Sequence, residues 1–173
     1  MYSIQELQEL INTSISKEKI GREPFSLYDP INYSLDSGGK RIRPALVLMA
    51  CNLFSDNLEH TIKPAIGLEI FHNFTLLHDD IMDHADIRRG NPTVHKKWSE
   101  NTAILSGDAM LIKAYEYFLD CKSPNFREVL KVFNNTALEV CEGQQYDMEF
   151  EDRENVTEQE YLRMIELKTS VLL

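Results

Sequence analysis

Apolar residues recur at helical spacing along most of this chain, and no stretch alternates between apolar and polar residues for long enough to predict a strand. Capping residues, glycines and prolines mark the expected ends of the helices. The pattern predicts helices at about residues 3–19, 29–38, 44–54, 60–86, 100–120 and 124–150, and from residue 158 onward. Because no repeat, low-complexity segment or linker interrupts it, we predict one all-α domain over residues 1–173.

The final predicted helix has a clear beginning and no stop signal. Thr157 and Glu160 form a capping box, and the apolar pattern then runs through Val171, Leu172 and Leu173 without a Gly or Pro to end it. We therefore expect this helix to continue to the last residue, as it would in a chain cut from a longer one.

The chain is acidic, because 18 Lys and Arg stand against 28 Asp and Glu, for a net charge of −10. Five of the cations cluster in two short motifs, so the positive field is local, which argues against a nucleic-acid partner. Cys51, Cys121 and Cys141 show no paired spacing and are expected to be reduced, buried thiols of a cytoplasmic protein. No apolar run approaches about 18 residues, so we predict neither a signal peptide nor stable membrane insertion.

Three carboxylates and two arginines lie within the eleven residues from Asp79 to Arg89. On a helix, Asp79 and Asp83 lie one turn apart on the same face, with Asp80 beside them. Two carboxylates ~4 Å apart repel by roughly 4 kcal/mol at an effective dielectric constant of about 20, so a cation between them is expected. Oxygen ligands favour Mg²⁺, which also binds substrate phosphates, and Arg88 and Arg89 can grip phosphate oxygens. The segment thus predicts metal-bridged pyrophosphate chemistry.

A cluster of acids on a helix is more often a solvated surface. Here the preceding residues, Ala65–Leu77, are too apolar for a surface helix, and carboxylates at the end of a buried helix need a partner. A second motif, Ser37–Pro44, sets Lys40, Arg41 and Arg43 behind a Gly-Gly pair at the start of a helix, where anions bind. Taken alone, this motif is as much a capped turn with solvated charges as an anion site. Together the two motifs favour a phosphate ligand.

Six motifs follow one another between residues 38 and 169: GGKRIRP, LLHDDIMD, RRGNPTVH, AILSGD, GQQYD and a Lys-Thr pair. In this order and spacing they resemble the trans-isoprenyl diphosphate synthase family, also called polyprenyl synthetases. The resemblance implies an all-α, isoprenoid synthase-type helical bundle. It also implies a Mg²⁺-dependent prenyltransferase that condenses isopentenyl diphosphate with dimethylallyl, geranyl or farnesyl diphosphate. Such chemistry needs metals to withdraw the pyrophosphate and an apolar tunnel that excludes water.

The resemblance also assigns roles to individual residues. It makes Asp79 and Asp83 the metal ligands, with Asp80 supporting them. The allylic diphosphate would contact Arg88, Lys168 and Thr169, with Gln144 and Asp147 in the same pocket. The isopentenyl diphosphate pocket would comprise Lys40, Arg43, His72 and Arg89. Without the resemblance, His72 would be a core histidine, Gln144 and Asp147 a helix-surface pair, and Lys168-Thr169 an ordinary helix end.

Product length in this family depends on the residues about one turn before the first Asp, because they floor the product tunnel. Here they are Phe74 and Thr75. A single aromatic at the fifth upstream position, with the two-residue gap in DDIMD, resembles short-chain synthases of the geranylgeranyl type. Farnesyl diphosphate is the alternative product.

The chain departs from the family in its length. Family members run to nearly twice as many residues and carry a second aspartate-rich motif, which nothing after Lys168 supplies. We therefore expect the N-terminal part of a longer enzyme, with negligible activity on its own. The family is usually homodimeric, and the missing half should leave part of the surface of Phe71, Phe74 and Leu77 uncovered.

Other classes of protein share parts of the pattern. His78-Asp79, with His60 or His72 upstream, imitates an HD-domain metal phosphohydrolase, but that class explains neither GGKRIRP nor the tandem arginines. An EF-hand loop is excluded because His84 occupies the position that requires Gly. A non-catalytic partner subunit of a heteromeric prenyl synthase stays open, although such subunits usually lack an intact aspartate motif.

Overall fold

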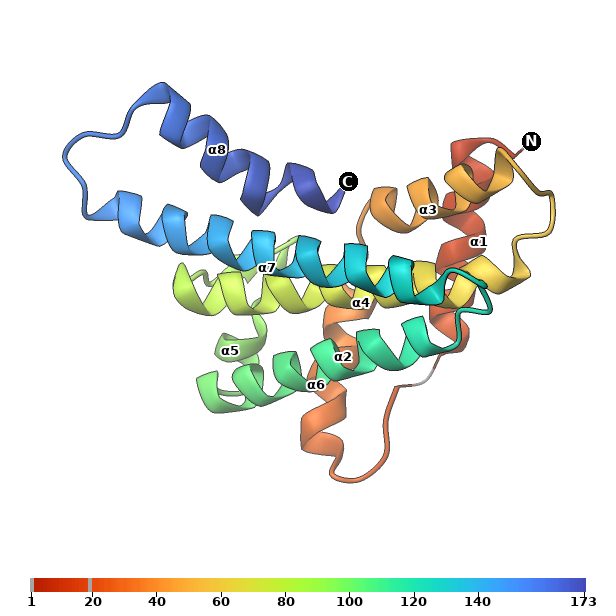
Figure 1. Ribbon diagram of the computed structural model, residues 1–173. Helices are drawn as coiled ribbons and strands as arrows, with labels where there is room; N and C mark the ends of the chain where they lie inside the picture. Colours follow the sequence, from red (N-terminus) through yellow and green to blue (C-terminus); the bar gives the residue numbers. More distant parts are fainter. Residues whose placement is uncertain (1, 19) are drawn as a thin grey trace. The chain divides into compact units, whose positions relative to one another are not determined.

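The computed structural model describes residues 2–18 and 20–173, and these residues are largely helical (Figure 1). The longer helices are α1 (Ile4–Lys17), α2 (Phe25–Asp36), α3 (Ile42–Asn52), α4 (Glu59–Met82), α6 (Glu100–Leu119), α7 (Phe126–Glu151) and α8 (Glu158–Lys168). The remaining elements are a short helix α5 (Val94–Lys97), a 3-10 turn η1 (Ser170–Leu172), and the strands β1 (Ile87–Arg88) and β2 (Asn91–Pro92). The all-α prediction is confirmed.

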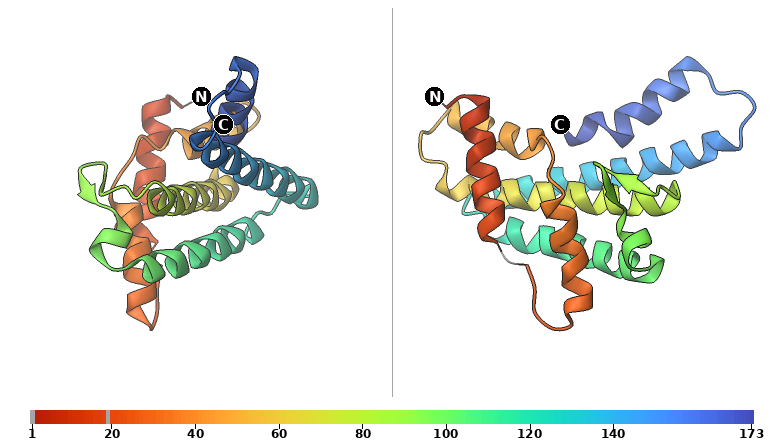
Figure 2. Two further views of the ribbon diagram at one scale, coloured as in Figure 1. Left: turned by 90° about the vertical axis from the view of Figure 1, so that its left-hand side faces the viewer. Right: turned by 180° about the vertical axis from the view of Figure 1, so that it is seen from behind.

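The chain divides into two compact units, one ending at Cys121 and the other beginning at Lys122. The organisation as a single domain stays a prediction. In the first unit α4 and α6 lie side by side and run in opposite directions (Figures 1 and 2). Both contribute fully buried side chains to the core, among them Ile66 and Ile70 of α4 and Met110 of α6. This packing makes α4 the buried helix that its sequence predicted.

The same packing corrects one expectation. Phe71 and Leu77 expose only 1% and 2% of their surface, so the expectation that both would be left uncovered is wrong. Phe74 is half-buried. Because α6 runs along α4, the first unit supplies cover that the sequence pattern alone did not reveal.

The C-terminal end of α4 differs from its predicted position. The helix ends at Met82 rather than near residue 86, because the chain turns at His84, whose φ is +51°. Two strands follow and pair as a hairpin through a two-residue turn at Arg89 and Gly90, both with positive φ. Such a turn matches the twist of the strands and favours glycine. Each strand holds only two residues, which is too short to produce an alternating sequence pattern.

Other helix boundaries were predicted with mixed success. The capping boxes at Ser3 and Thr157 are present as predicted. The second helix starts after Pro24, earlier than Asp29, and contains Pro30 within it. Helix α8 ends at Lys168 and gives way to a 3-10 turn, so the prediction of one helix to the last residue is wrong. Its last turn tightens as the backbone of the next residue leaves the helical region.

The second unit consists of α7 and α8, which run in opposite directions (Figure 1). Their close approach depends on Gly143 of α7, because a Cβ there would lie 2.2 Å from the backbone nitrogen of Lys168. Cys141 on the same helix is exposed, and Cys51 and Cys121 are only half-buried, so the expectation of buried cysteines is wrong, although all three thiols are free. Among the described residues, no helix has the combination of length and apolar character that crossing a membrane requires.

Candidate functional site

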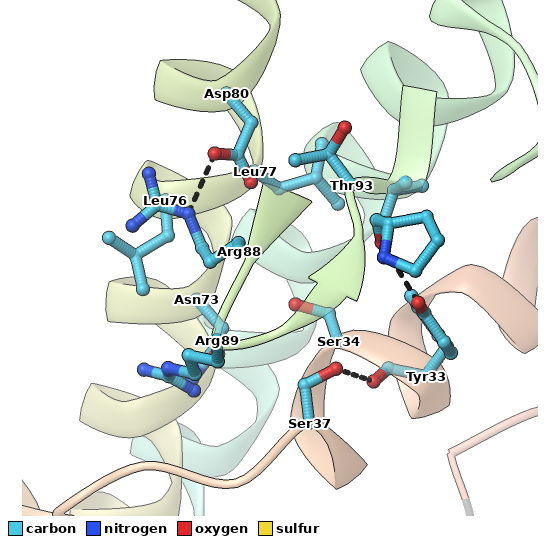
Figure 3. A pocket seen from close by; sticks show the side chains of 12 residues that line it. Tyr33, Ser34, Ser37, Asn73, Leu76, Leu77, Asp80, Arg88, Arg89 and Thr93 are labelled. Carbon is cyan, nitrogen blue, oxygen red and sulfur yellow. Dashed lines mark hydrogen bonds and ion pairs between the residues drawn. The ribbon is translucent and has the colours of Figure 1, made fainter. Parts of the chain in front are cut away.

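The acidic residues of the DDIMD segment lie at the end of α4. Figure 3 shows Asp80 of this segment beside Arg88 of the hairpin. Nε of Arg88 donates to Oδ1 of Asp80 over 2.7 Å, and its Nη2 donates to Oδ2 of Asp79 over 3.1 Å. Asp80 is buried, and burial raises the pKa of its carboxyl, while the hydrogen bond from Arg88 opposes that rise. The chain therefore supplies a counterion of its own to two of the three carboxylates.

The third carboxylate, Asp83, lies at the C-cap of α4 and is exposed. Its backbone N–H donates to the carbonyl of Asp79 over 2.8 Å, so the two acids are one helical turn apart, as predicted. Within residues 2–18 and 20–173, no three His, Cys, Asp or Glu side chains converge on a point that could hold a metal ion. Two carboxylates one turn apart still fit Mg²⁺, which takes one or two carboxylates and fills its shell with water and phosphate oxygens.

The hairpin also meets the Ser37–Pro44 motif. Nη1 of Arg89 donates to the carbonyl of Gly38, which lies 51 positions earlier in the sequence. Next to this contact is an open pocket of about 480 Å³, which we call the cationic pocket. It is lined by Ser37, Gly39, Lys40, Arg41, Ile42, Arg43, Glu69, His72 and Arg89. The structure thus brings together the four residues predicted for the isopentenyl diphosphate pocket.

The electrostatics of the cationic pocket suit a multiply charged anion. Burial, and then the charges of Arg43 and the other nearby arginines, lowers the pKa of His72 to about 3, so its ring is neutral at pH 7. Burial also lowers the pKa of Arg43 and of Arg89. Nη1 of Arg43 lies 3.5 Å from Nε2 of His72, and its buried Nε has no hydrogen-bond partner in the described part of the chain. A bound anion would supply the missing acceptor and offset the crowded positive charge.

Arg41 lines the same pocket but is already engaged. Its guanidinium pairs with Glu69 over 2.5 Å and donates to the carbonyl of Leu35 over 2.6 Å, and the side chain is almost completely buried. Glu69 also accepts a hydrogen bond from Asn73. The sequence analysis did not predict this network. Glu69 could have indicated it, because it is a single acid within the apolar run of α4. Arg41 joins α2 to α4 and forms part of the wall of the pocket.

The remaining diphosphate candidates belong to the second unit and form a group within it. Nζ of Lys168 lies 2.5 Å from Oδ2 of Asp147, which joins the end of α8 to α7. The neighbouring Gln144 has a buried Nε2 with no hydrogen-bond partner among the described residues. Thr169 is exposed at the C-cap of α8. The close packing at Gly143 accounts for this grouping, because it brings the backbone of Lys168 against α7.

The two residues predicted to limit product length lie beside His72 and His78. Oγ1 of Thr75 donates to the carbonyl of His72 over 2.8 Å. The ring of Phe74 contacts Phe71 at 5.6 Å and meets His78 edge-on at 4.7 Å between ring centroids. His78 itself lies 3.4 Å from the carbonyl of Ile104. Comparison with known proteins does not favour the HD-domain phosphohydrolase alternative.

Comparison with known proteins points to one family. The sequence model described as polyprenyl synthetase matches residues 25–173. The chain is 48% identical over 151 residues to geranylgeranyl diphosphate synthase of Methanosarcina mazei, covering 86% of this chain and 47% of that protein. It is 40% identical to geranylfarnesyl diphosphate synthase of Natronomonas pharaonis, covering 98% of this chain and 55% of the relative.

Solved structures agree with the sequence comparison. A crystal structure of geranylgeranyl pyrophosphate synthase superposes with a TM-score of 0.95 at 53% identity, covering 99% of this chain and 53% of that one. The isoprenoid synthase-type helical fold is therefore confirmed over the length of the chain. The chain spans about half the length of the curated relatives it matches.

Proposed function

This chain belongs to the polyprenyl synthetase family, and on that premise we propose that it binds isopentenyl diphosphate and an allylic diphosphate for Mg²⁺-dependent prenyl transfer. Because the chain spans about half the length of its relatives, we propose that turnover needs in addition the part of those relatives that this chain does not match. The observation that carries the proposal is a cationic pocket beside the carboxylates of a buried helix.

In this proposal the cationic pocket takes isopentenyl diphosphate. Lys40, Arg43 and Arg89 bind the phosphate oxygens, with the unpartnered Nε of Arg43 as one donor. His72 contributes a neutral ring that can hydrogen-bond to the ligand without adding a further charge to the pocket.

The allylic diphosphate lies on the other side of the hairpin in this proposal. Members of this family generally depend on Mg²⁺, and here Asp79 and Asp83 would hold it, with Asp80 supporting them. When bound, Mg²⁺ supplies positive charge that stabilises the departing pyrophosphate. Arg88 would grip the same diphosphate, and for Lys168 and Thr169, with Gln144 and Asp147, we propose the same ligand on the resemblance of their motifs to the family.

The proposal extends to product, location and assembly. Two relatives are a geranylgeranyl and a geranylfarnesyl diphosphate synthase, and for this chain we propose a short-chain product limited by Phe74 and Thr75. We also propose a cytoplasmic homodimer with reduced cysteines, without insertion into membranes.

Calorimetry of the chain with Mg²⁺ and inorganic pyrophosphate tests the binding half of the proposal. Two carboxylates alone should bind Mg²⁺ weakly, and pyrophosphate should strengthen that binding because it supplies the missing oxygen ligands. The variant Arg88→Gln should weaken pyrophosphate binding in the presence of Mg²⁺. Tight Mg²⁺ binding to the bare chain would instead reveal a different, closed metal site and contradict the proposal.

A chimera tests turnover. It would carry residues 1–173 followed by the C-terminal part of the Methanosarcina mazei synthase, and it would be assayed with isopentenyl diphosphate and each allylic primer. We expect prenyl transfer by the chimera, negligible transfer by the chain alone, and loss of activity in the Asp79→Asn chimera. A folded chimera that binds both substrates without joining them would favour a non-catalytic partner subunit.

A further inference from the structure

The hairpin that carries Arg88 and Arg89 is too short to hold its position unaided. Its strands pair at only two positions, Ile87 with Pro92 and Arg88 with Asn91. Isolated hairpins of much greater length are only marginally stable in water. The orientation of both guanidinium groups must therefore depend on contacts between the hairpin and the rest of the first unit.

Some of those contacts use the arginines themselves. Arg88 holds Asp79 and Asp80, and Arg89 donates to the carbonyl of Gly38. The proposed function asks the same guanidinium groups to bind diphosphate. When the two guanidinium groups bind a ligand, their hydrogen bonds to Asp79, Asp80 and Gly38 are weakened or lost. The hairpin then needs another contact with the first unit, one that the ligand does not replace.

Tyr33 of α2 makes such a contact (Figure 3). Its hydroxyl donates to the carbonyl of Pro92 over 2.8 Å, which joins β2 to α2. Its ring lies 3.7 Å from Nζ of Lys97 and meets the ring of Trp98 edge-on at 5.2 Å. Tyr33 therefore contacts β2 and also the segment that follows it.

Thr93, which directly follows β2, also stabilises the hairpin. It is buried, and its Oγ1 donates to the carbonyl of Ala85 over 2.7 Å. Its backbone N–H donates to the carbonyl of Asp86 over 3.0 Å. These bonds close the hairpin on itself, whereas the bond from Tyr33 ties it to another helix.

We propose that Tyr33 is a positioning residue for Arg88 and Arg89, an inference that rests on the proposed function. It holds β2 against α2. Both guanidinium groups therefore keep their positions when a diphosphate replaces the carboxylate partners of Arg88 and the carbonyl partner of Arg89. The hydroxyl is the essential part, because the ring alone cannot fix the carbonyl of Pro92.

The test compares Tyr33→Phe with the unmodified chain and with Tyr28→Phe, which removes the hydroxyl of another tyrosine of α2. Pyrophosphate affinity in the presence of Mg²⁺ should fall about fivefold in Tyr33→Phe, the equivalent of one ordinary hydrogen bond, and stay unchanged in Tyr28→Phe. Amide exchange from residue 87 to residue 93 should become faster in Tyr33→Phe alone. Emission from Trp98, the only tryptophan, should stay constant because the neighbouring ring is retained.

Each outcome decides the proposal. Equal pyrophosphate affinity in Tyr33→Phe and the unmodified chain would overturn it, even with faster exchange, because the anchor would then not serve the arginines. If the unmodified chain fails to bind pyrophosphate, the proposed function fails separately. Hairpin exchange then decides whether Tyr33 is an anchor: faster exchange in Tyr33→Phe supports it, and equal exchange refutes it.

Discussion

Burial and existing partners determine what each arginine near the cationic pocket can do. Arg41 cannot turn toward a ligand without leaving the buried carboxylate of Glu69 unpaired, and breaking a buried pair costs about 3–5 kcal/mol. Arg43 has the opposite character, because its buried Nε has no hydrogen-bond partner in the described ranges. Arg41 and Arg43, two arginines of one motif, therefore differ in role: the first is structural and the second is a candidate ligand.

The lowered pKa of His72 predicts that acid destabilises the fold. Its pKa is about 3 in the folded state and about 6.5 when unfolded, so the unfolded state binds an extra proton throughout that window. The free energy of unfolding should therefore fall as the pH drops below 6.5, by up to about 1.4 kcal/mol per pH unit from this residue. Urea unfolding at pH 7 and at pH 5 measures this effect. Between these two pH values, the free energy of unfolding of His72→Gln should fall by about 2 kcal/mol less than that of the unmodified chain.

The control for this experiment is His60→Gln, which changes an exposed histidine of the same helix. Its loss of stability between the two pH values should match that of the unmodified chain. Carboxyl groups such as Asp80 also titrate, but they are present in every variant and cancel in the comparison. Equal losses in His72→Gln and His60→Gln would contradict the assignment.

Product length gives a second prediction at the scale of one residue. The ring of Phe74 packs between Phe71 and His78, so removing it opens space beside α4. In the chimera described above, Phe74→Ala should shift the products to longer chains, as measured by chromatography of radiolabelled products. Phe54→Ala, which removes a ring that is 91% exposed, should leave the profile unchanged. An unchanged profile in Phe74→Ala would remove this residue from the floor of the tunnel.

At the scale of elements, long helices with caps were predictable and the segment after α4 was not. The capping boxes at Ser3 and Thr157 carry their own hydrogen-bond partners in the sequence, which fixes both helix starts. The turn at His84 and the hairpin depend on backbone contacts, such as the N–H of Ala85 donating to the carbonyl of Asp80. Side-chain periodicity does not report such contacts.

The candidate site follows the same division. Resemblance predicted one site for Lys40, Arg43, His72 and Arg89, and these residues line one pocket. It did not reveal that Arg88 already pairs with Asp79 and Asp80, nor that Glu69 engages Arg41, because pairings across helices depend on tertiary packing. The roles of these residues toward substrates and metal stay predictions.

Gly143 provides the prediction at this scale. A Cβ at this position would lie 2.2 Å from the backbone nitrogen of Lys168, so the backbone of α8 must move away in Gly143→Ala. We expect a loss of about 1–3 kcal/mol in the local stability of α8, a typical cost of overpacking. Amide exchange along α8 would measure it. Glu142→Ala changes an exposed neighbour on α7 and should leave that exchange unaltered, and equal exchange in both variants would contradict the close packing.

At the scale of the whole molecule, the charge is distributed in a way that favours small anionic ligands over large ones. The net charge of −10 repels polyanions at a distance, whereas a few cations are gathered where a diphosphate would bind. Salt screens exposed charges over about 10 Å at 0.1 M, so the local cluster keeps its effect when the long-range repulsion is reduced.

Exposed apolar residues on α6 predict self-association. Leu105, Ile112 and Leu119 are seven residues apart and expose 60%, 63% and 67% of their surface, so they form one stripe along the helix. Exposed apolar side chains aligned on one helix can mark a contact with a partner. We expect light scattering to give a mass above that of one chain, and Ile112→Glu to shift the distribution toward monomer. Phe54→Glu, which replaces a single exposed ring outside α6 with the same charged side chain, should leave the mass unchanged. A monodisperse monomer before substitution would show that the stripe alone does not drive assembly.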